Sequence, residues 1–160
     1  MRKVAIAIAV SIFLMMILSG CAGVQKIGTR AEALRQMILD TGRTQDWVVK
    51  DRHAKRLDLF HEFENGDWIF IWVSVILEPT EALDIYSRAE WQGEFHIQHY
   101  TDIGFTDEVD YVTLICDGVD VPLKKEDYQI VYFKALLHTA TFIQQGWFED
   151  EPMIKKARWQ

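Results

Sequence analysis

Histidine and carboxylate side chains are the groups in this chain that could hold a metal ion or transfer a proton. His96 and His99 are three residues apart, a spacing that would put both rings on one side of a helix. Residues 95–100 alternate like a strand, however, and odd spacing there sends the two rings to opposite faces. His61-Glu62 is not followed by a second histidine four residues after His61, so the zinc-protease pattern is absent. The sequence therefore predicts no metal site.

Acidic residues gather between positions 102 and 120, a stretch without a basic residue. The regular Asp-x-Asp-x-Asp-Gly spacing of a calcium-binding loop does not occur in it. We therefore expect a solvated acidic rim, which could still steer a basic partner. Its members are Asp102, Asp107, Glu108, Asp110, Asp117 and Asp120.

Motifs for nucleophilic catalysis are missing. The sequence contains no Gly-x-Ser-x-Gly elbow, no Ser-x-x-Lys pair and no glycine-rich phosphate loop. Carboxylate pairs are plentiful, but they catalyse only at a defined separation within a cleft, which sequence spacing does not give. We therefore expect a protein without catalytic residues and without a bound cofactor.

The N-terminus has the pattern of a secretory signal. Arg2 and Lys3 precede an apolar run over residues 4–18 that is interrupted only by Ser11. Such a basic start and apolar run are the n-region and h-region of a signal peptide. The run is shorter than the roughly 20 residues that a spanning helix needs. We predict that residues 1–20 are a cleaved signal peptide; an uncleaved signal anchor is the alternative.

The apolar run ends in Leu18-Ser19-Gly20-Cys21, an apolar residue and two small residues before a cysteine. Here the chain resembles the bacterial lipoproteins, whose lipobox has this pattern directly after the h-region. The resemblance implies cleavage between Gly20 and Cys21, a diacylglyceryl thioether on the Cys21 sulfur and an acyl group on its new α-amine. Two or three acyl chains hold a protein on a membrane far better than one.

The same resemblance predicts a location. In enteric bacteria an aspartate after the lipidated cysteine signals retention in the inner membrane, and Ala22 stands there instead. The periplasmic face of the outer membrane is therefore favoured. The formal charge of −7 excludes a broad nucleic-acid-binding face, and it repels the body from anionic lipid head groups. Residues 21–28 then serve as the acylated cysteine and a short tether.

Acylation of Cys21 would leave Cys116 without a partner for an intramolecular disulfide, because the chain has two cysteines. Cys116 ends the alternating run over residues 111–116. A buried, inert thiol is the simplest interpretation. An intermolecular disulfide or a reactive site is the alternative.

The remaining chain has the composition of one folded domain, over residues 29–148, followed by a charged tail over residues 149–160. Thr29 and Glu32 match a capping box before a helix over about 30–40. Residues 126–145 have apolar positions at helical spacing, and Gly146 follows as a C-terminal cap.

Strand signals fill the middle of this domain. We expect a strand within 44–53, and strand pairs that turn at Gln92-Gly93 and at Asp117-Gly118. The order of elements predicts an α+β fold, an antiparallel sheet with an N-terminal helix and a long C-terminal helix packed on it.

Asn65-Gly66 is the clearest turn signal, because Asn-Gly is the preferred centre of a two-residue type I′ hairpin. That turn pairs Glu64 with Asp67 and Phe63 with Trp68. The strand over residues 68–77 is apolar on both faces, so it should be central and covered on both sides. The predicted register makes one face of the hairpin from Leu59, His61, Phe63, Trp68, Phe70 and Trp72.

This aromatic face is either ordinary core or the wall of a pocket for an acyl chain or glycan, in which His61 orients the ligand. Two functions follow. The first is a lipid-anchored, non-catalytic lipoprotein of the cell envelope that binds a protein partner or helps to assemble another envelope component. The second is a carrier or sensor of an apolar ligand. A cavity of several hundred Å³ between helix and sheet favours the carrier; a packed interior with an exposed apolar patch favours the partner-binding protein.

Overall fold

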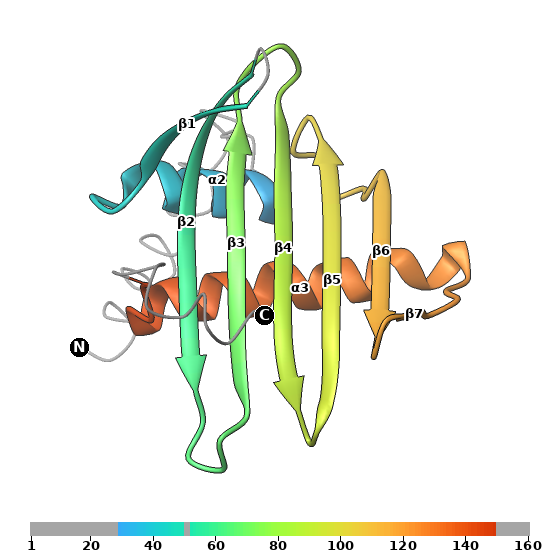
Figure 1. Cartoon of the computed structure of the whole chain (residues 1–160). Coiled ribbons are helices and arrows are strands. Elements are labelled where there is room, and N and C mark those ends of the chain that lie inside the picture. Colours follow the sequence, from blue (N-terminus) through green and yellow to red (C-terminus); the bar gives the residue numbers. More distant parts are fainter. Residues whose placement is uncertain (1–28, 50–51, 150–160) are drawn as a thin grey trace, which may run out of the picture.

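The computed structural model describes residues 29–49 and 52–149. They form a seven-stranded antiparallel sheet, in which each strand pairs with the next one along the chain, and two helices that lie on one face of it (Figure 1). The predicted α+β fold is therefore confirmed. The elements are α2 (Arg30–Asp40), β1 (Gln45–Val49), β2 (Arg52–Glu62), β3 (Trp68–Ile76), β4 (Ala82–Trp91), β5 (Glu94–Ile103), β6 (Tyr111–Cys116), β7 (Val119–Asp120) and α3 (Lys125–Gln145).

Several predictions fall outside the described residues. They concern the signal peptide over 1–20, the acylated Cys21 with its tether over 21–28, and residues 150–160 of the charged tail. Within the described part of the chain, no helix has both the length and the apolar run that crossing a membrane requires.

The hydrophobic core lies between the two helices and one face of the sheet. Both helices cross the strands on this same side (Figure 1). Strand β3 is central in the sheet, as predicted. Among the described residues, helices cover one of its two predicted faces and none covers the other. The most deeply enclosed side chains of the core are Ala31, Leu34, Ile38, Leu57, Leu59, Ile71, Val73, Val75, Leu83, Ile85, Tyr100 and Tyr132.

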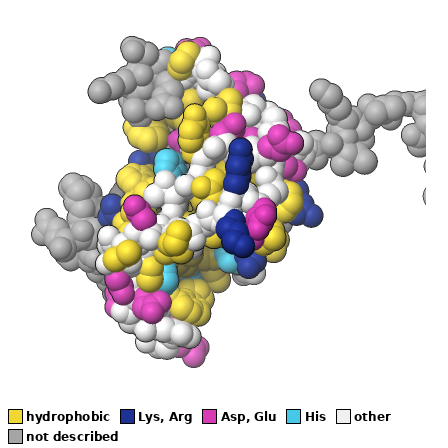
Figure 2. Space-filling model, turned by 90° about the vertical axis from the view of Figure 1, so that its right-hand side faces the viewer, with side chains coloured by type: hydrophobic (Ala, Val, Ile, Leu, Met, Phe, Trp, Pro, Cys, Tyr) yellow, Lys and Arg dark blue, Asp and Glu magenta, His cyan; other side chains and the backbone are white. Residues whose placement is uncertain are grey.

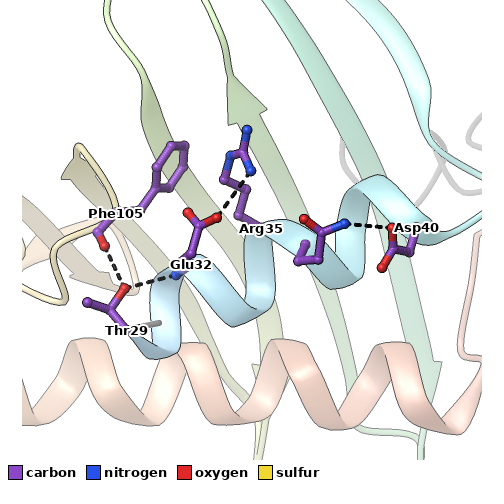
Figure 3. Close-up of polar contacts among 6 residues, drawn as sticks. Thr29, Glu32, Arg35, Asp40 and Phe105 are labelled. Carbon is purple, nitrogen blue, oxygen red and sulfur yellow. Dashed lines mark hydrogen bonds and ion pairs between the residues drawn. The ribbon is translucent and has the colours of Figure 1, made fainter. Parts of the chain in front are cut away.

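Helix α2 begins at the predicted N-cap. The Thr29 hydroxyl accepts a hydrogen bond from the Glu32 backbone N–H (3.0 Å) and donates one to the carbonyl oxygen of Phe105 (2.6 Å) (Figure 3). The threonine half of the predicted capping box is thus present, while the Glu32 carboxylate pairs with the Arg35 guanidinium at 3.2 Å. The bond to Phe105 ties the start of α2 to the loop after β5.

Asp107, from the same loop, caps the first turn of α2. Its carboxylate accepts hydrogen bonds from the backbone N–H groups of Arg30 (2.9 Å) and Ala31 (2.6 Å). The first N–H groups of a helix lack partners within the helix, and its positive end favours an anion. This carboxylate therefore stabilises α2 through a contact that joins residues far apart in the sequence.

Asp102, at the end of β5, is fully buried. Its carboxylate accepts hydrogen bonds from the backbone N–H groups of Thr106 (2.9 Å) and Asp107 (3.0 Å) and from the Tyr132 hydroxyl of α3 (2.8 Å). The expectation that Asp102 belongs to a solvated acidic rim is therefore wrong, because its carboxylate is buried and accepts hydrogen bonds there. Asp107 is partly exposed, but its carboxylate caps α2.

Two of the predicted turns form as expected. Gln92-Gly93 and Asp117-Gly118 have positive φ at both central residues, as a type I′ turn requires, and they join β4 to β5 and β6 to β7. The strand predicted within 44–53 is present as β1, over 45–49, and it forms a hairpin with the start of β2.

The loop at Asn65-Gly66 differs from the prediction by one residue. The Phe63 N–H donates to the Asp67 carbonyl oxygen (2.7 Å), and the Gly66 N–H donates to the Phe63 carbonyl oxygen (3.0 Å). Gly66 has positive φ, and Asn65 does not. These are the features of a three-residue loop, a type I turn followed by a left-handed glycine.

This longer loop changes the register of the hairpin. Trp68 pairs with Glu62, and Trp72 pairs with Asp58. The predicted pairing of Phe63 with Trp68 is wrong by one residue. Because side chains alternate along a strand, that single shift moves every side chain of one strand to the other face relative to its partner.

Helix α3 ends at Gly146, as predicted, in the left-handed conformation (φ 69°). The chain then returns to β2: the Phe60 N–H donates to the Trp147 carbonyl oxygen, and the Glu149 N–H donates to the Asp58 carbonyl oxygen, both at 2.8 Å. The described end of the chain is therefore held against the sheet by backbone hydrogen bonds.

Candidate functional site

The six residues of the predicted pocket lie on two different faces of the sheet. Leu59, His61 and Phe63 point to the side of the helices, and Trp68, Phe70 and Trp72 point to the opposite side. The predicted single aromatic wall is therefore wrong, and the cause is the three-residue loop at Asn65-Gly66 described above.

On the helix side, the three residues have different roles. Leu59 is wholly buried in the core. The His61 ring stacks on the Trp147 ring, with centroids 3.6 Å apart and planes 7° apart. The Phe63 ring meets the Trp91 ring edge-on at 5.2 Å. Of the three, Phe63 lines the cleft described below.

On the opposite side, the aromatic side chains form a layer of their own. Trp72 contacts Phe70 and Tyr86 edge-on, at centroid distances of 5.9 and 5.3 Å. The Arg56 guanidinium lies 4.0 Å from the centre of the Trp72 ring, a cation–π contact. The Trp68 indole N–H donates to the Glu90 carboxylate at 3.1 Å. These rings pack on one another and not against a described helix.

A cleft of about 590 Å³ opens between α3 and the helix side of the sheet. This is where we expected a cavity for a carrier, although most of its residues are not those of the predicted hairpin face. Strands β3 to β6 supply one wall and α3 supplies the other. Its apolar lining consists of Phe63, Ile69, Ala89, Trp91, Leu114, Val131, Ala135 and Phe142.

A few polar groups accompany this apolar lining. The Tyr100 hydroxyl donates to the Gln98 side-chain oxygen at 3.1 Å, with Ser87 and His96 also in the wall. Burial raises the pKa of Tyr100 to about 12, so its hydroxyl is neutral at physiological pH. The sheet side of the cleft is thus largely apolar with a few hydrogen-bonding groups.

The rim of the cleft on α3 carries basic side chains. Lys134 and His138 are four residues apart, so they share one side of the helix, and both are exposed. None of the described residues that line the cleft is an aspartate or a glutamate. This distribution contrasts with the formal charge of −7 for the whole chain. An anionic group is therefore better accommodated here than over most of the surface.

The histidines at 96 and 99 lie on opposite faces, as their spacing predicts. His96 lines the cleft, whereas the His99 ring contacts Tyr86 on the other side at 5.8 Å. Figure 2 views the molecule from the side of β6 and β7, where hydrophobic side chains lie among both acidic and basic ones.

Cys116, at the end of β6, is partly exposed, so the simplest interpretation of it as a buried thiol is wrong. Desolvation raises the pKa of the Cys116 thiol, and the carboxylates of Glu94 and Asp117 raise it further. Its sulfur lies 3.9 Å from the Glu94 carboxylate.

Sequence reasoning missed the α3 side of the cleft. Lys134, Ala135 and His138 lie on one face of a long helix, and that face could have been singled out as an apolar stripe with basic residues beside it. The strands that this face of α3 packs against could not be predicted without the register of the sheet.

Comparisons with protein-family models, with curated proteins and with solved structures found no match to this chain.

Proposed function

We propose that this chain is a lipid-anchored, non-catalytic protein of the cell envelope that carries or senses a ligand with an apolar body and an anionic head group. The observation that carries the proposal is the cleft between α3 and the sheet. Its volume of about 590 Å³ lies within the range of small-molecule sites. Of the two functions expected from the sequence, the carrier is therefore favoured.

The lining of the cleft supports an acyl chain over a glycan. Rings and aliphatic side chains such as Phe63, Leu114 and Phe142 make up most of the lining. Transfer of a hydrocarbon chain from water to such an apolar lining is favourable. A glycan would need many more hydrogen-bonding partners than Ser87 and Gln98 supply.

The rim supports an anionic head group. Lys134 stands on the exposed side of α3, and His138 follows one turn later. A carboxylate or phosphate placed there would meet a positive charge and no neighbouring carboxylate among the described lining residues. A fatty acid with its chain in the cleft satisfies both requirements.

The anchor belongs to the same proposal. The lipobox that ends in Cys21 would tether the domain to a membrane, with the periplasmic face of the outer membrane as the favoured location, and acyl-chain ligands are abundant there. Cys21→Ser removes the acceptor sulfur and should leave an unprocessed precursor without label from a palmitate analogue. Undiminished labelling of that variant would contradict the anchor.

The ligand is tested with a photoactivatable fatty acid and the full chain reconstituted in phospholipid nanodiscs. A covalent adduct shows where on the protein the probe binds, and probe that only dissolves in the lipid gives no adduct in the cleft. We expect mass spectrometry to place the adduct on peptides that line the cleft. Ala89→Trp fills the cleft from β4 and should reduce labelling at least tenfold, whereas Ile97→Trp, on the opposite face of β5, should not. Equal labelling of these two variants would overturn the proposal.

The head group is tested with a charge-matched pair. Lys134→Glu places an anion at the rim and should weaken labelling by the fatty acid about tenfold or more. Lys125→Glu makes the same change of net charge at the start of α3 and should leave labelling unchanged. A photoactivatable fatty alcohol should label both variants equally, because that probe has no charge for Lys134 to bind.

A second candidate function is the binding of an envelope protein. It is favoured by an apolar groove of about 610 Å³ between α2 and α3, beside which Ile130 and Leu137 are 56% and 65% exposed. Large exposed apolar side chains at a groove are typical of protein contacts. A photo-crosslinking residue at position 137 should then give one defined protein adduct in cells, and one at Val119, equally exposed on the sheet edge, should not.

A further inference from the structure

We infer that Glu94, His96 and Cys116 form a binding site for a zinc ion at the corner of the sheet where β5 begins and β6 ends. Their ligand atoms all lie within 4.8 Å of one another. Within residues 29–49 and 52–149, this is the one place where three such groups come together. The inference does not depend on the proposed function, because it requires no ligand in the cleft.

The strands place these three side chains on one face. His96 on β5 is paired directly with Cys116 on β6, so their side chains project to the same side. Glu94 precedes His96 by two residues on the same strand, and alternation puts its side chain beside that of His96. This juxtaposition follows from strand pairing and from no local sequence motif.

The backbone at this corner is held rigidly. The Phe95 N–H donates to the Asp117 side-chain oxygen, and the Asp117 N–H donates to the Phe95 carbonyl oxygen, both at 2.8 Å. Phe95 lies between Glu94 and His96, and Asp117 follows Cys116. These bonds hold the backbone that carries the three ligands in place before any ion binds, which lowers the cost of assembling a site.

The distances suit zinc. The Glu94 Oε2 atom lies 3.5 Å from His96 Nε2 and 3.9 Å from Cys116 Sγ. Tetrahedral zinc with ordinary bond lengths separates nitrogen from oxygen by about 3.4 Å and sulfur from oxygen by about 3.6 Å. The third separation, between the His96 nitrogen and the Cys116 sulfur, is at most 4.8 Å, against about 3.6 Å around tetrahedral zinc. A shift of up to about 1 Å would therefore bring all three atoms to bonding distance of a common ion.

The chemical set also suits zinc. A thiolate, an imidazole and a carboxylate are its three usual protein ligands, whereas Mg²⁺ and Ca²⁺ prefer oxygen alone. Binding releases the Cys116 thiol proton to solvent and joins the thiolate and the Glu94 carboxylate to the divalent cation, so the two anionic ligands and the ion sum to zero charge. Three protein ligands leave a fourth position for water.

The experiment uses the full chain, purified in detergent, reduced and stripped of metal with a chelator. Zinc affinity is measured by competition with a chromogenic chelator, and Co²⁺ serves as a spectroscopic probe for a thiolate ligand. We expect one equivalent of zinc per chain and a thiolate-to-cobalt absorption band. Cys116→Ser should abolish the band, and Cys116→Ser and His96→Gln should each weaken zinc binding at least tenfold.

His99→Gln is the matched control, since it lies on the same strand with its ring on the opposite face. Its zinc affinity and cobalt spectrum should equal those of the parent chain. Glu94→Gln, at an exposed position, is a second ligand variant that tests the site even where Cys116→Ser folds poorly. The absence of a thiolate band in the parent chain, or equal zinc affinity of the parent and Glu94→Gln, would overturn the inference.

Discussion

The Tyr132 hydroxyl donates a hydrogen bond of 2.8 Å to the carboxylate of Asp102, and both side chains are fully buried. Tyr132 belongs to the middle of α3, and Asp102 belongs to the end of β5. The same carboxylate accepts backbone hydrogen bonds from Thr106 and Asp107. This pair therefore joins the long helix, the sheet and the loop that caps α2.

Replacing Asp102 should be among the most destabilising single changes. Asp102→Ala leaves the Tyr132 hydroxyl and two backbone N–H groups without their acceptor inside the protein, at a cost of about 3–5 kcal/mol. Tyr132→Phe removes one bond to a charged group and should cost about 1.5–3 kcal/mol. Urea unfolding measures both. Asp120→Ala, at an exposed carboxylate, is the control; a loss for Asp102→Ala no larger than the control's would contradict the described network.

Alkaline pH should destabilise the fold through its buried tyrosines. Burial raises the pKa of Tyr100 to about 12, and burial followed by the Asp102 carboxylate raises that of Tyr132 as well. Above about pH 10 the two phenols lose their protons in the unfolded chain but keep them in the folded chain. Their contribution to the free energy of unfolding is therefore fully present below about pH 10 and falls as the pH rises.

The expected slope is about 1.4 kcal/mol per pH unit for each tyrosine that stays protonated, until the pH passes its folded pKa. Unfolding free energies measured between about pH 9 and pH 12 give this slope, and tyrosinate absorbance follows the ionisation. Tyr100→Phe should reduce this slope by the contribution of one tyrosine. A parent chain whose stability does not change over this range would contradict the burial of both phenols.

The loop between β2 and β3 can be tested at Gly66. Its φ is +87°, and a β-carbon added at this position would meet no atom within 4 Å, so any cost comes from the backbone alone. Gly66→Val should cost about 1–3 kcal/mol. Gly42→Val, at a glycine with equally open surroundings and no positive φ, should change stability by less than about 0.5 kcal/mol. Thermal midpoints that shift equally for the two variants would argue against this loop.

The two faces of the hairpin should differ in their sensitivity to truncation. Leu59 is 0% exposed beneath the helices, and Leu59→Ala should cost about 2–5 kcal/mol. Trp72 is only partly buried, on the face without a described helix, so Trp72→Ala should cost less despite the larger side chain. Chemical unfolding of both variants provides the comparison. A greater loss for Trp72→Ala would indicate that its face is covered in solution.

Local signals in the sequence were sufficient wherever the structure depends on neighbouring residues. The N-cap at Thr29, the end of α3 at Gly146 and the turn at Gln92-Gly93 each follow from the conformational preferences of a few adjacent residues. These signals, together with the alternation of apolar residues, were enough to predict an antiparallel sheet with a helix at each end of the domain.

Local signals could not predict the register of the hairpin formed by β2 and β3, because Asn-Gly suits both a two-residue and a three-residue loop. Contacts from elsewhere distinguish them. The Asp67 carboxylate accepts the side-chain N–H of Asn65 (2.9 Å) and the backbone N–H of Gln92 (3.1 Å), which joins this loop to the next hairpin. The observed register also brings Leu59 under the helices.

The sequence by itself therefore determined the lipobox expectation, the order of the elements and most of their ends, since these depend on residues close together in the chain. Only the tertiary structure decided which side chains share a surface. The cleft and the cluster of Glu94, His96 and Cys116 bring together residues from separate strands and from α3, and a shift of one residue in pairing moves a whole set of side chains to the other face.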